Sequence, residues 1–222
     1  MTESMIHLLP EEIQKERRSR SPYHRALHWM SAFEKPDGFA PAVDVFITQK
    51  AYVRVCAQAG SDLDNEVGGW LVGKHRVDGL TGREYVVIEK VLPAHKTNYS
   101  STHFTFTQDS MVELHKVLES DYPQKELVGW YHTHPRMGVF FSGWDEWLHR
   151  NFFPEAWRVA LVIEPHSSSG GFFINQSDGN LDTHQYFGFF ELTNGQQRSV
   201  VHWKNLTTDS DWSRTSESEK NK

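Results

Sequence analysis

The sequence predicts one α/β domain in which a mixed central sheet is flanked by helices. Segments whose apolar residues recur with the period of a helix alternate along the chain with segments typical of strands. Of the 222 residues, 38% are hydrophobic, which is enough to bury one core but not two. We therefore expect one domain at residues 41–206, preceded by a loosely ordered or partner-binding arm at 1–40 and followed by a disordered polar tail at 207–222.

The first elements of this domain are a helix and a pair of strands. Thr48 can cap a helix that ends near Gly60, because apolar residues recur one turn apart between them. An apolar run bounded by glycines then covers residues 68–73, and a run rich in Val and Ile covers 84–92. The dipeptide Asp78-Gly79 lies between these runs, which predicts two strands joined by a tight turn.

The second half of the chain continues the alternation. Residues 103–107 alternate like a strand, and Thr107 then caps a helix that Pro123 closes. Ser142 begins a further helix that runs to about residue 152. The remaining strands are expected at residues 127–134, 159–163, 171–175 and 186–192.

Composition excludes several classes of function. The formal net charge is -6, whereas phosphate binding needs a basic face, so nucleic acid is not expected as a ligand. The single cysteine, Cys56, cannot form an intrachain disulfide, and its place in the middle of a predicted helix argues against a thiol protease. The chain has no secretory signal and no run of about 18 apolar residues, so we expect a cytoplasmic protein without a membrane span.

Two histidines are placed where a metal site could form. His132 and His134 are two residues apart on a predicted strand, so both imidazoles project from the same face. Pro135 ends the strand and leaves the pair at its C-terminal edge, where a cleft can open. A chain with 13 histidines is expected to contain about one such pair by chance, so the pair alone is weak support for a ligand role.

A serine and an aspartate complete the pattern. Ser142 followed three residues later by Asp145 is typical of a helix N-terminus, which places both side chains on the first turn. Alone, this pattern is an ordinary helix cap. Combined with the histidine pair and Pro135 at their fixed spacing, a chance match falls to roughly one in several thousand.

These residue types point to hydrolysis. Two neutral imidazoles and one carboxylate make a three-ligand site with its fourth position open, as expected of catalytic rather than structural zinc. Zinc lowers the pKa of a water in that position to about 7, which provides a nucleophile at neutral pH. Ser142 could donate a hydrogen bond to the oxyanion that forms when a carbonyl is attacked.

One segment resembles the signature of the JAMM metallopeptidases, the JAB/MPN family, without a gap or substitution: His132-x-His134-Pro135 followed by Ser142-x-x-Asp145. Glu66, shortly before the glycine-bounded run, is similar to the remaining catalytic residue of that family. The resemblance covers residues 43–192. It implies an MPN/JAB-like, cytidine-deaminase-like fold, one zinc ion held by the two histidines and Asp145, and Glu66 as the general acid/base beside a zinc-bound water.

The resemblance also implies a substrate. Family members with a complete metal site cut the isopeptide or peptide bond after the C-terminal tail of ubiquitin or a ubiquitin-like protein, so such proteins, their conjugates and their conjugation enzymes are the implied partners. The tail would bind as an added strand, which we expect along residues 170–175. Endosomal relatives carry an additional zinc site with a Cys ligand in a later insertion, where this chain has Ser167-Ser168-Ser169-Gly170-Gly171 and no Cys. A simpler member is implied, of the bacterial type found beside ubiquitin-like conjugation enzymes and in anti-phage operons.

Other functions stay open. Many members of this fold have lost the ligands and serve as scaffolds, although here the ligand set is intact. A zinc peptidase or amidase could instead act on small substrates or on sulfur-carrier conjugates. His149 lies four residues after Asp145 on the same helix face, either as a support for the metal site or as a surface residue.

Overall fold

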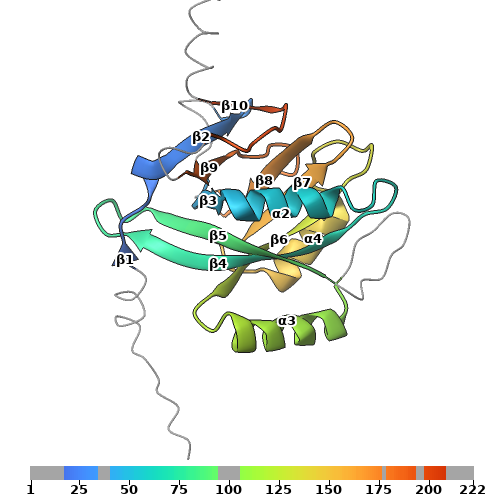
Figure 1. Ribbon diagram of the computed structural model, residues 1–222, viewed down its shortest axis with the longest axis horizontal. Coiled ribbons are helices and arrows are strands. Elements are labelled where there is room, and N and C mark those ends of the chain that lie inside the picture. The colour runs from blue at the N-terminus through green and yellow to red at the C-terminus, as the bar shows by residue number, and fades with distance from the viewer. Residues whose placement is uncertain (1–17, 35–40, 95–105, 177–178, 194–197, 209–222) are drawn as a thin grey trace, which may run out of the picture.

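The computed structural model describes residues 18–34, 41–94, 106–176, 179–193 and 198–208. These residues form one mixed ten-stranded sheet with helices on both faces, which confirms the predicted α/β class (Figure 1). The helices are α2 (Gln49–Ala59), α3 (Gln108–Asp121) and α4 (Gly143–Phe152). The strands are β1 (Arg18–Ser19), β2 (Ala26–Ser31), β3 (Asp44–Thr48), β4 (Gly68–Asp78), β5 (Glu84–Pro93), β6 (Glu126–Thr133), β7 (Val159–Glu164), β8 (Ser169–Ile174), β9 (Phe189–Leu192) and β10 (Leu206–Thr208).

The sheet is organised around the long β4–β5 hairpin. The strand order is β10-β2-β9-β3-β5-β4-β6-β7-β8, and β1 pairs with β4 in parallel. β3 runs parallel to β5 and β9, and β6 runs parallel to β7, whereas the other neighbours are antiparallel. Asp78 closes the hairpin, because its Oδ1 accepts hydrogen bonds from the backbone N–H groups of Leu80 and Thr81 at 3.0 and 2.9 Å. The predicted turn is therefore confirmed.

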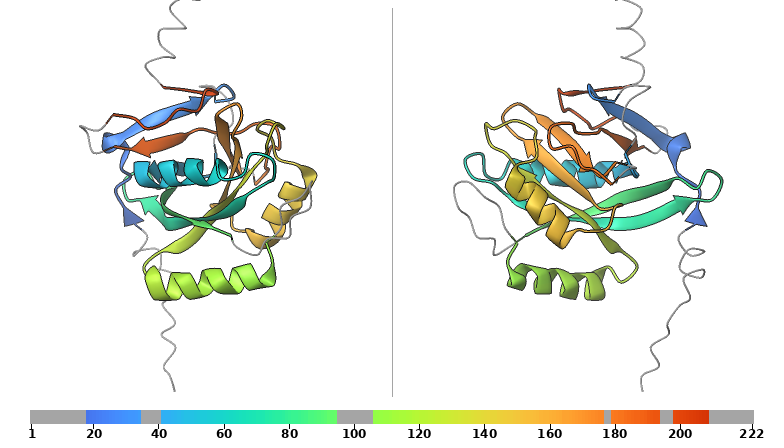
Figure 2. Two further views of the ribbon diagram at one scale, coloured as in Figure 1. Left: turned by 45° about the vertical axis from the view of Figure 1, so that its right-hand side comes forward. Right: turned by 180° about the vertical axis from the view of Figure 1, so that it is seen from behind.

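Alternate residues of the central strands face two separate cores. α2 covers one face of the sheet, and α3 and α4 lie on the other (Figure 2). Leu71 packs into the core under α2, whereas Trp70 and Val72 pack into the core under α3 and α4. In β7, Leu161 faces the first core and Val162 the second. Because both faces are covered, these strands appear in the sequence as continuous apolar runs.

Both early helices begin at their predicted caps. Thr48 Oγ1 accepts a hydrogen bond from the backbone N–H of Ala51 at 3.3 Å, and Gly60 ends the helix. The Thr107 hydroxyl accepts from the N–H of Ser110 at 3.2 Å in the same way. The strand predicted just before Thr107 falls mainly at 103–105, outside the described residues, and residues 106–107 are not in a strand.

Residues 18–34 belong to the folded body, which corrects the prediction of a loose arm over 1–40. β2 lies in the sheet between β10 and β9. Five of its six residues are only half-buried, so they show no apolar face, and its partner strands come from the other end of the chain. At that end β10 runs to Thr208, past the predicted boundary at 206. Residues 1–17, 35–40 and 209–222 lie outside the described part of the chain.

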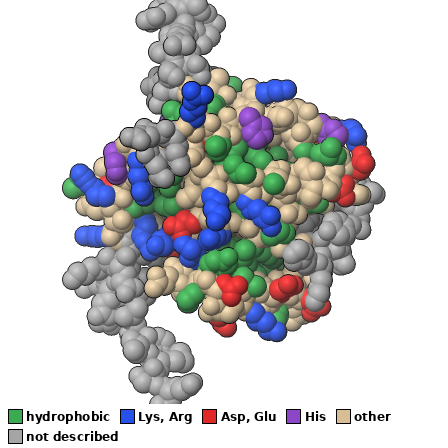
Figure 3. Space-filling view, viewed as in Figure 1, with side chains coloured by type: hydrophobic (Ala, Val, Ile, Leu, Met, Phe, Trp, Pro, Cys, Tyr) green, Lys and Arg blue, Asp and Glu red, His purple; other side chains and the backbone are tan. Residues whose placement is uncertain are grey.

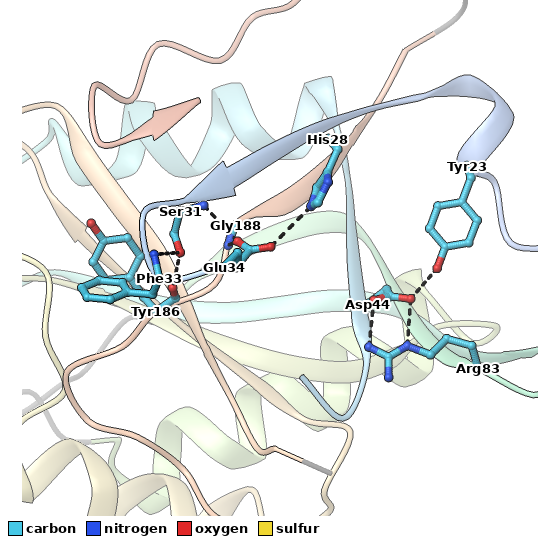
Figure 4. Close-up of polar contacts among 9 residues, drawn as sticks. All are labelled: Tyr23, His28, Ser31, Phe33, Glu34, Asp44, Arg83, Tyr186 and Gly188. Atoms are coloured by element: carbon cyan, nitrogen blue, oxygen red, sulfur yellow. Dashed lines mark hydrogen bonds and ion pairs between the residues drawn. The ribbon is translucent and has the colours of Figure 1, made fainter. Parts of the chain in front are cut away.

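Polar contacts fasten this N-terminal segment to the sheet. The Tyr23 hydroxyl donates to the carboxylate of Asp44, and the Arg83 guanidinium pairs with both oxygens of that carboxylate at 2.9 and 3.0 Å (Figure 4). Further along, the Ser31 hydroxyl donates to the backbone carbonyl of Tyr186 at 2.7 Å. The segment is thus held at two separate points.

Basic side chains gather on one face of this acidic chain. Figure 3 shows Lys and Arg side chains near the middle of the face on which α2 lies. The formal net charge is nevertheless -6, so the basic character is local. No helix among the described residues is long and apolar enough to cross a membrane.

Because β2 is paired within the sheet, we expect Trp29→Ala to destabilise the protein. Trp29 packs against the core under α2, and its Nε1 donates to the buried carboxylate of Glu191 at 3.0 Å. Because the ring is half-buried, we expect a loss of about 2–3 kcal/mol in the free energy of unfolding, measured by denaturant titration. Leu80→Ala, at a side chain that is 76% exposed, should change it by less than about 0.5 kcal/mol. Equal, small effects of both substitutions would mean that β2 is not part of the cooperative fold.

Candidate metal centre

Strand β6 positions the two histidines. His132 lies within β6, in register with Val162 of β7. His134 follows the strand, and its backbone N–H donates to the carbonyl of Ile163 at 2.9 Å. Both imidazoles reach Asp145 on α4. The predicted geometry, with both rings on one side of the strand end, is therefore present.

Helix α4 presents the carboxylate through its cap. The Ser142 Oγ accepts a hydrogen bond from the backbone N–H of Asp145 at 3.1 Å, and Asp145 Oδ2 accepts from the backbone N–H of Ser142 at 2.8 Å. This is the reciprocal capping box that the spacing predicts. The Ser142 hydroxyl also donates to the same Oδ2 at 2.6 Å, so the carboxylate is held in one orientation.

The three predicted ligands meet in a buried cluster. Each of His132, His134 and Asp145 is at most 3% exposed. The two Nε2 atoms lie 2.9 Å apart, Asp145 Oδ1 lies 3.2 Å from Nε2 of His132, and Oδ2 lies 3.5 Å from Nε2 of His134. Ligand atoms bound at 2.0–2.1 Å to a tetrahedral zinc ion stand about 3.3 Å from one another. The donor set and its spacing therefore fit one tetrahedral metal ion.

The electrostatics of the cluster favour a proton or a cation between these groups. Burial alone would raise the pKa of Asp145, but the charge of His132 and the hydrogen bonds from His132, His134 and Ser142 outweigh it and hold that pKa well below its usual range. Burial opposes a charged His132, yet Asp145, with a smaller contribution from Glu66, raises the pKa of His132. Asp145 thus stays ionised at neutral pH and attracts positive charge.

Aromatic rings surround the cluster. Trp130 and Phe141 are buried and belong to the core under α3 and α4. The Phe140 ring lies 4.8 Å from the imidazole of His134 and is half-buried, as is Trp144 on the first turn of α4. Trp130 and Phe141 therefore form the inner side of the site, and Phe140 lies against His134 on a less buried side.

Glu66 is placed beside the histidines by a strand contact. The backbone N–H of Val67 donates to the Thr133 hydroxyl, and the N–H of Thr133 donates to the carbonyl of Val67, both at 2.9 Å. Thr133 lies between the two candidate ligands, so the residue before Val67 comes next to them. Glu66 is half-buried there and its charge acts on His132. It is not among the groups that meet at the metal-ligand cluster.

Cys56 has none of the features of a nucleophile. It is half-buried on α2, which lies on the face of the sheet opposite to α4. Burial raises the pKa of its thiol to about 11, although hydrogen bonds with Tyr52 and Trp203 act in the other direction. The thiol therefore stays protonated at neutral pH, as expected of a packed residue.

The edge of β8 is occupied, which corrects the expectation that a substrate tail adds along residues 170–175. The side chain of Asn205 bonds to both the N–H and the carbonyl of Gly170, at 3.1 and 2.9 Å. Phe172 exchanges two backbone hydrogen bonds with Phe187, at 2.9 and 2.7 Å. An added strand would need these same groups, so Gly170 and Phe172 offer no free pairing groups to it.

Sequence reasoning missed a buried carboxylate that supports the turn after the second histidine. Glu164, at the end of β7, accepts hydrogen bonds from the backbone N–H groups of Arg136 at 3.0 Å, His166 at 2.9 Å and Ser167 at 2.7 Å. Arg136 lies two residues after His134 and has a φ of 62°, which is unfavourable for a residue other than glycine. Glu164 therefore helps to hold this turn, and no periodicity or spacing marks it in the sequence.

The sequence of this chain is similar to those of several known proteins. The chain is 35% identical over 155 residues to the NAD(+) hydrolase TcpA of Theionarchaea archaeon (strain DG-70-1), which covers 65% of this chain and 42% of that protein. It is 27% identical over 128 residues to COP9 signalosome complex subunit 5 of Candida albicans, covering 54% of this chain and 20% of that protein. It is 29% identical over 149 residues to the 26S proteasome regulatory subunit RPN11 of Encephalitozoon cuniculi, covering 64% of this chain and 48% of that protein. The chain thus spans less than half the length of each of these relatives.

A family profile gives the broader assignment. The profile described as prokaryotic homologs of the JAB domain matches residues 48–172. This range includes Glu66, both histidines, Ser142 and Asp145, and it makes up more than half of the chain. The chain therefore belongs to the family of prokaryotic homologs of the JAB domain, as the resemblance to JAMM proteins indicated.

Proposed function

We propose that this chain is a zinc-dependent peptidase that hydrolyses the peptide or isopeptide bond after the C-terminal tail of ubiquitin or a ubiquitin-like protein. The observation that carries the proposal is the buried convergence of His132, His134 and Asp145. Buried ionisable groups are costly unless they are paired or hold a metal ion. Two imidazoles and one carboxylate suit zinc, and they leave a coordination position for catalysis.

Residues next to the ligands transfer the proton and stabilise the oxyanion. Zinc at this site would supply a Lewis acid and a water with a pKa of about 7. Glu66 accepts a proton from the attacking water and delivers it to the leaving amine as the C–N bond breaks. Ser142 orients Asp145, and its hydroxyl can turn from the carboxylate to donate a hydrogen bond to the oxyanion on the substrate carbonyl.

Membership of the JAB-domain family supports a protein substrate. Two relatives are named as subunits of the COP9 signalosome and of the 26S proteasome, and the two matches cover 54% and 64% of this chain. We infer that conjugates of a ubiquitin-like protein are the substrate class and that conjugation enzymes of the same pathway are partners. The name NAD(+) hydrolase belongs to a relative of which the chain spans 42%, and the ligand set described here gives no separate support for that reaction.

Two alternatives make different predictions. A scaffold needs no ion, so its partner binding would survive loss of the ligands. An amidase for small substrates or sulfur-carrier conjugates needs the ion but not a folded ubiquitin-like protein. The intact ligand cluster favours an enzyme over a scaffold.

The central prediction concerns Glu66→Gln. The substitution keeps the size of the side chain but removes the proton acceptor, so we expect kcat on a fluorogenic ubiquitin C-terminal conjugate to fall at least about 100-fold. Zinc content should not change, because Glu66 is not one of the three ligands. Zinc is measured on the same samples by mass spectrometry.

Glu146→Gln is the matched control. This carboxylate is next to Asp145 in sequence but pairs with Arg150 on the outer side of α4 at 2.8 Å. The control should keep activity within about twofold of the wild type. A zinc-loaded Glu66→Gln protein that is as active as the control would remove Glu66 from the reaction. A zinc-loaded wild type that is silent on ubiquitin but cuts small amides would favour the amidase.

Zinc affinity should rise with pH. The pKa of His132 is raised above its usual value of about 6.5, so below that raised pKa the imidazole carries a proton that zinc must displace. The same raised pKa stabilises the metal-free fold below about pH 6.5, and this contribution is lost as the pH rises through the pKa of the folded state. Asp145 is already ionised and releases no proton. We therefore expect His132 to release up to about one proton per zinc below its raised pKa and none above it, where a zinc-bound water with a pKa of about 7 would release a proton instead.

Calorimetric titration in buffers of different ionisation enthalpy measures this proton release. Asp145→Asn provides a second check, because it removes the charge that raises the pKa of His132 and also removes a ligand. Zinc affinity should fall in this variant, and the proton release from His132 should end at a lower pH as the pH rises. A zinc affinity that is independent of pH in the wild type would contradict the assignment of His132 as a ligand.

A further inference from the structure

The indole of Trp130 links the metal centre to a buried histidine on α4. Trp130 is fully buried and stacks on the imidazole of His132, with ring centroids 4.7 Å apart and planes 13° from parallel. Its Nε1 donates a hydrogen bond to Nδ1 of His149 at 3.1 Å. A continuous path of contacts therefore runs from a metal ligand through the indole to His149.

His149 is a neutral ring that accepts a hydrogen bond from Trp130. Burial lowers its pKa to about 4, with added repulsion from Arg150 and Arg158, so the ring is neutral at physiological pH. Because Nδ1 accepts from Trp130, the single ring proton lies on Nε2. That Nε2 is buried and has no hydrogen-bond partner among the residues that the structure describes. The ring thus accepts one hydrogen bond and leaves its own donor unused.

This arrangement is costly for a residue that only fills space. A buried donor without an acceptor lowers stability, and an apolar side chain of similar size would avoid the penalty. Phe153 already packs against both partners, with its ring centroid 5.8 Å from those of Trp130 and His149. What histidine adds over leucine here is the acceptor nitrogen for the indole.

One face of α4 therefore contributes two residues to the metal site, a candidate ligand and the hydrogen-bond acceptor of Trp130. Asp145 and His149 are four residues apart, both buried, so the same turn of helix that supplies a ligand also holds the indole behind another ligand. The ring plane of His132 is restricted by the indole on which it stacks. A metal site depends on such support, because a ligand that is free to rotate loses affinity for its ion.

We propose that His149 is a positioning residue for the metal centre, which acts by fixing Trp130 against the imidazole of His132. The inference rests on the metal site of the proposed function and not on the identity of the substrate. Outer partners of metal-ligating histidines typically change metal affinity by about 10–100-fold. We expect an effect of that size when the bond between His149 and Trp130 is broken.

A double-mutant cycle on the full chain tests this role. His149→Leu removes the acceptor and keeps most of the volume, whereas Trp130→Phe removes the donor and keeps an aromatic ring. Zinc affinity is measured by competition with a chromophoric chelator. Each single variant should bind zinc at least about 10-fold more weakly, and the double variant should be little weaker than the worse single, because both changes break the same bond.

His149→Gln is the matched control, because its amide oxygen can accept from the indole without a ring. It should recover most of the zinc affinity. The visible spectrum of the cobalt(II)-loaded protein, which reports ligand geometry, should change in His149→Leu and stay close to the wild type in His149→Gln. A role in packing alone would not separate these two variants. If His149→Leu does not fold, Trp130→Phe and His149→Gln still test the inference. Trp130→Phe should lose zinc affinity, whereas His149→Gln should retain most of it.

Three results would overturn the inference while leaving the proposed function intact. These are wild-type zinc affinity in folded His149→Leu, equal losses in the leucine and glutamine variants, or fully additive losses in the cycle. A wild type that binds no zinc would instead overturn the metal centre and this inference together. The two failures are thus distinguishable.

Discussion

The register of β6 between β4 and β7 determines where the two histidines and Glu66 of the candidate site lie. Gly129 permits this register, because a Cβ at that position would stand 2.0 Å from the carbonyl oxygen of Val159 on β7. Three residues later His132 faces α4, and Thr133 bonds to the chain that leads into β4. A shift of one residue would turn the imidazoles toward the core under α2 and away from Asp145. The ligand cluster is therefore a consequence of strand pairing, to which α4 adds the carboxylate.

The parts of the fold that could be predicted from the sequence depend on local patterns. The caps at Thr48 and Thr107 mark helix starts, and the Asp78-Gly79 turn marks the central hairpin, because each of these signals acts within a few residues. The convergence of His132, His134 and Asp145 was also predictable, since their spacing combines the period of a strand with a helix cap. Glu66 was not predictable from physical reasoning alone. Its place beside the histidines depends on a pairing between residues that are 66 positions apart in sequence.

The parts that could not be predicted depend on contacts between distant segments. β2 has no apolar periodicity, and its place in the sheet follows from partners at the other end of the chain. Nothing in the sequence near β8 indicates that its edge is paired, but Asn205 and Phe187 form hydrogen bonds with its backbone groups. Burial of His149 likewise follows from how α4 packs on β6, so its sequence position fits a surface residue equally well. Such features appear only when the whole sheet is assembled.

The most direct test of the central claim is X-ray absorption spectroscopy of the zinc-loaded chain, combined with its metal content. We expect one zinc ion per chain in a four-coordinate site, with two imidazoles and the remaining ligands oxygen, at about 2.0–2.1 Å. Asp145→Ala should lose most of the bound metal. A chain that retains no zinc, or whose zinc shows a sulfur ligand or fewer than two imidazoles, would mean that His132, His134 and Asp145 do not form a zinc site.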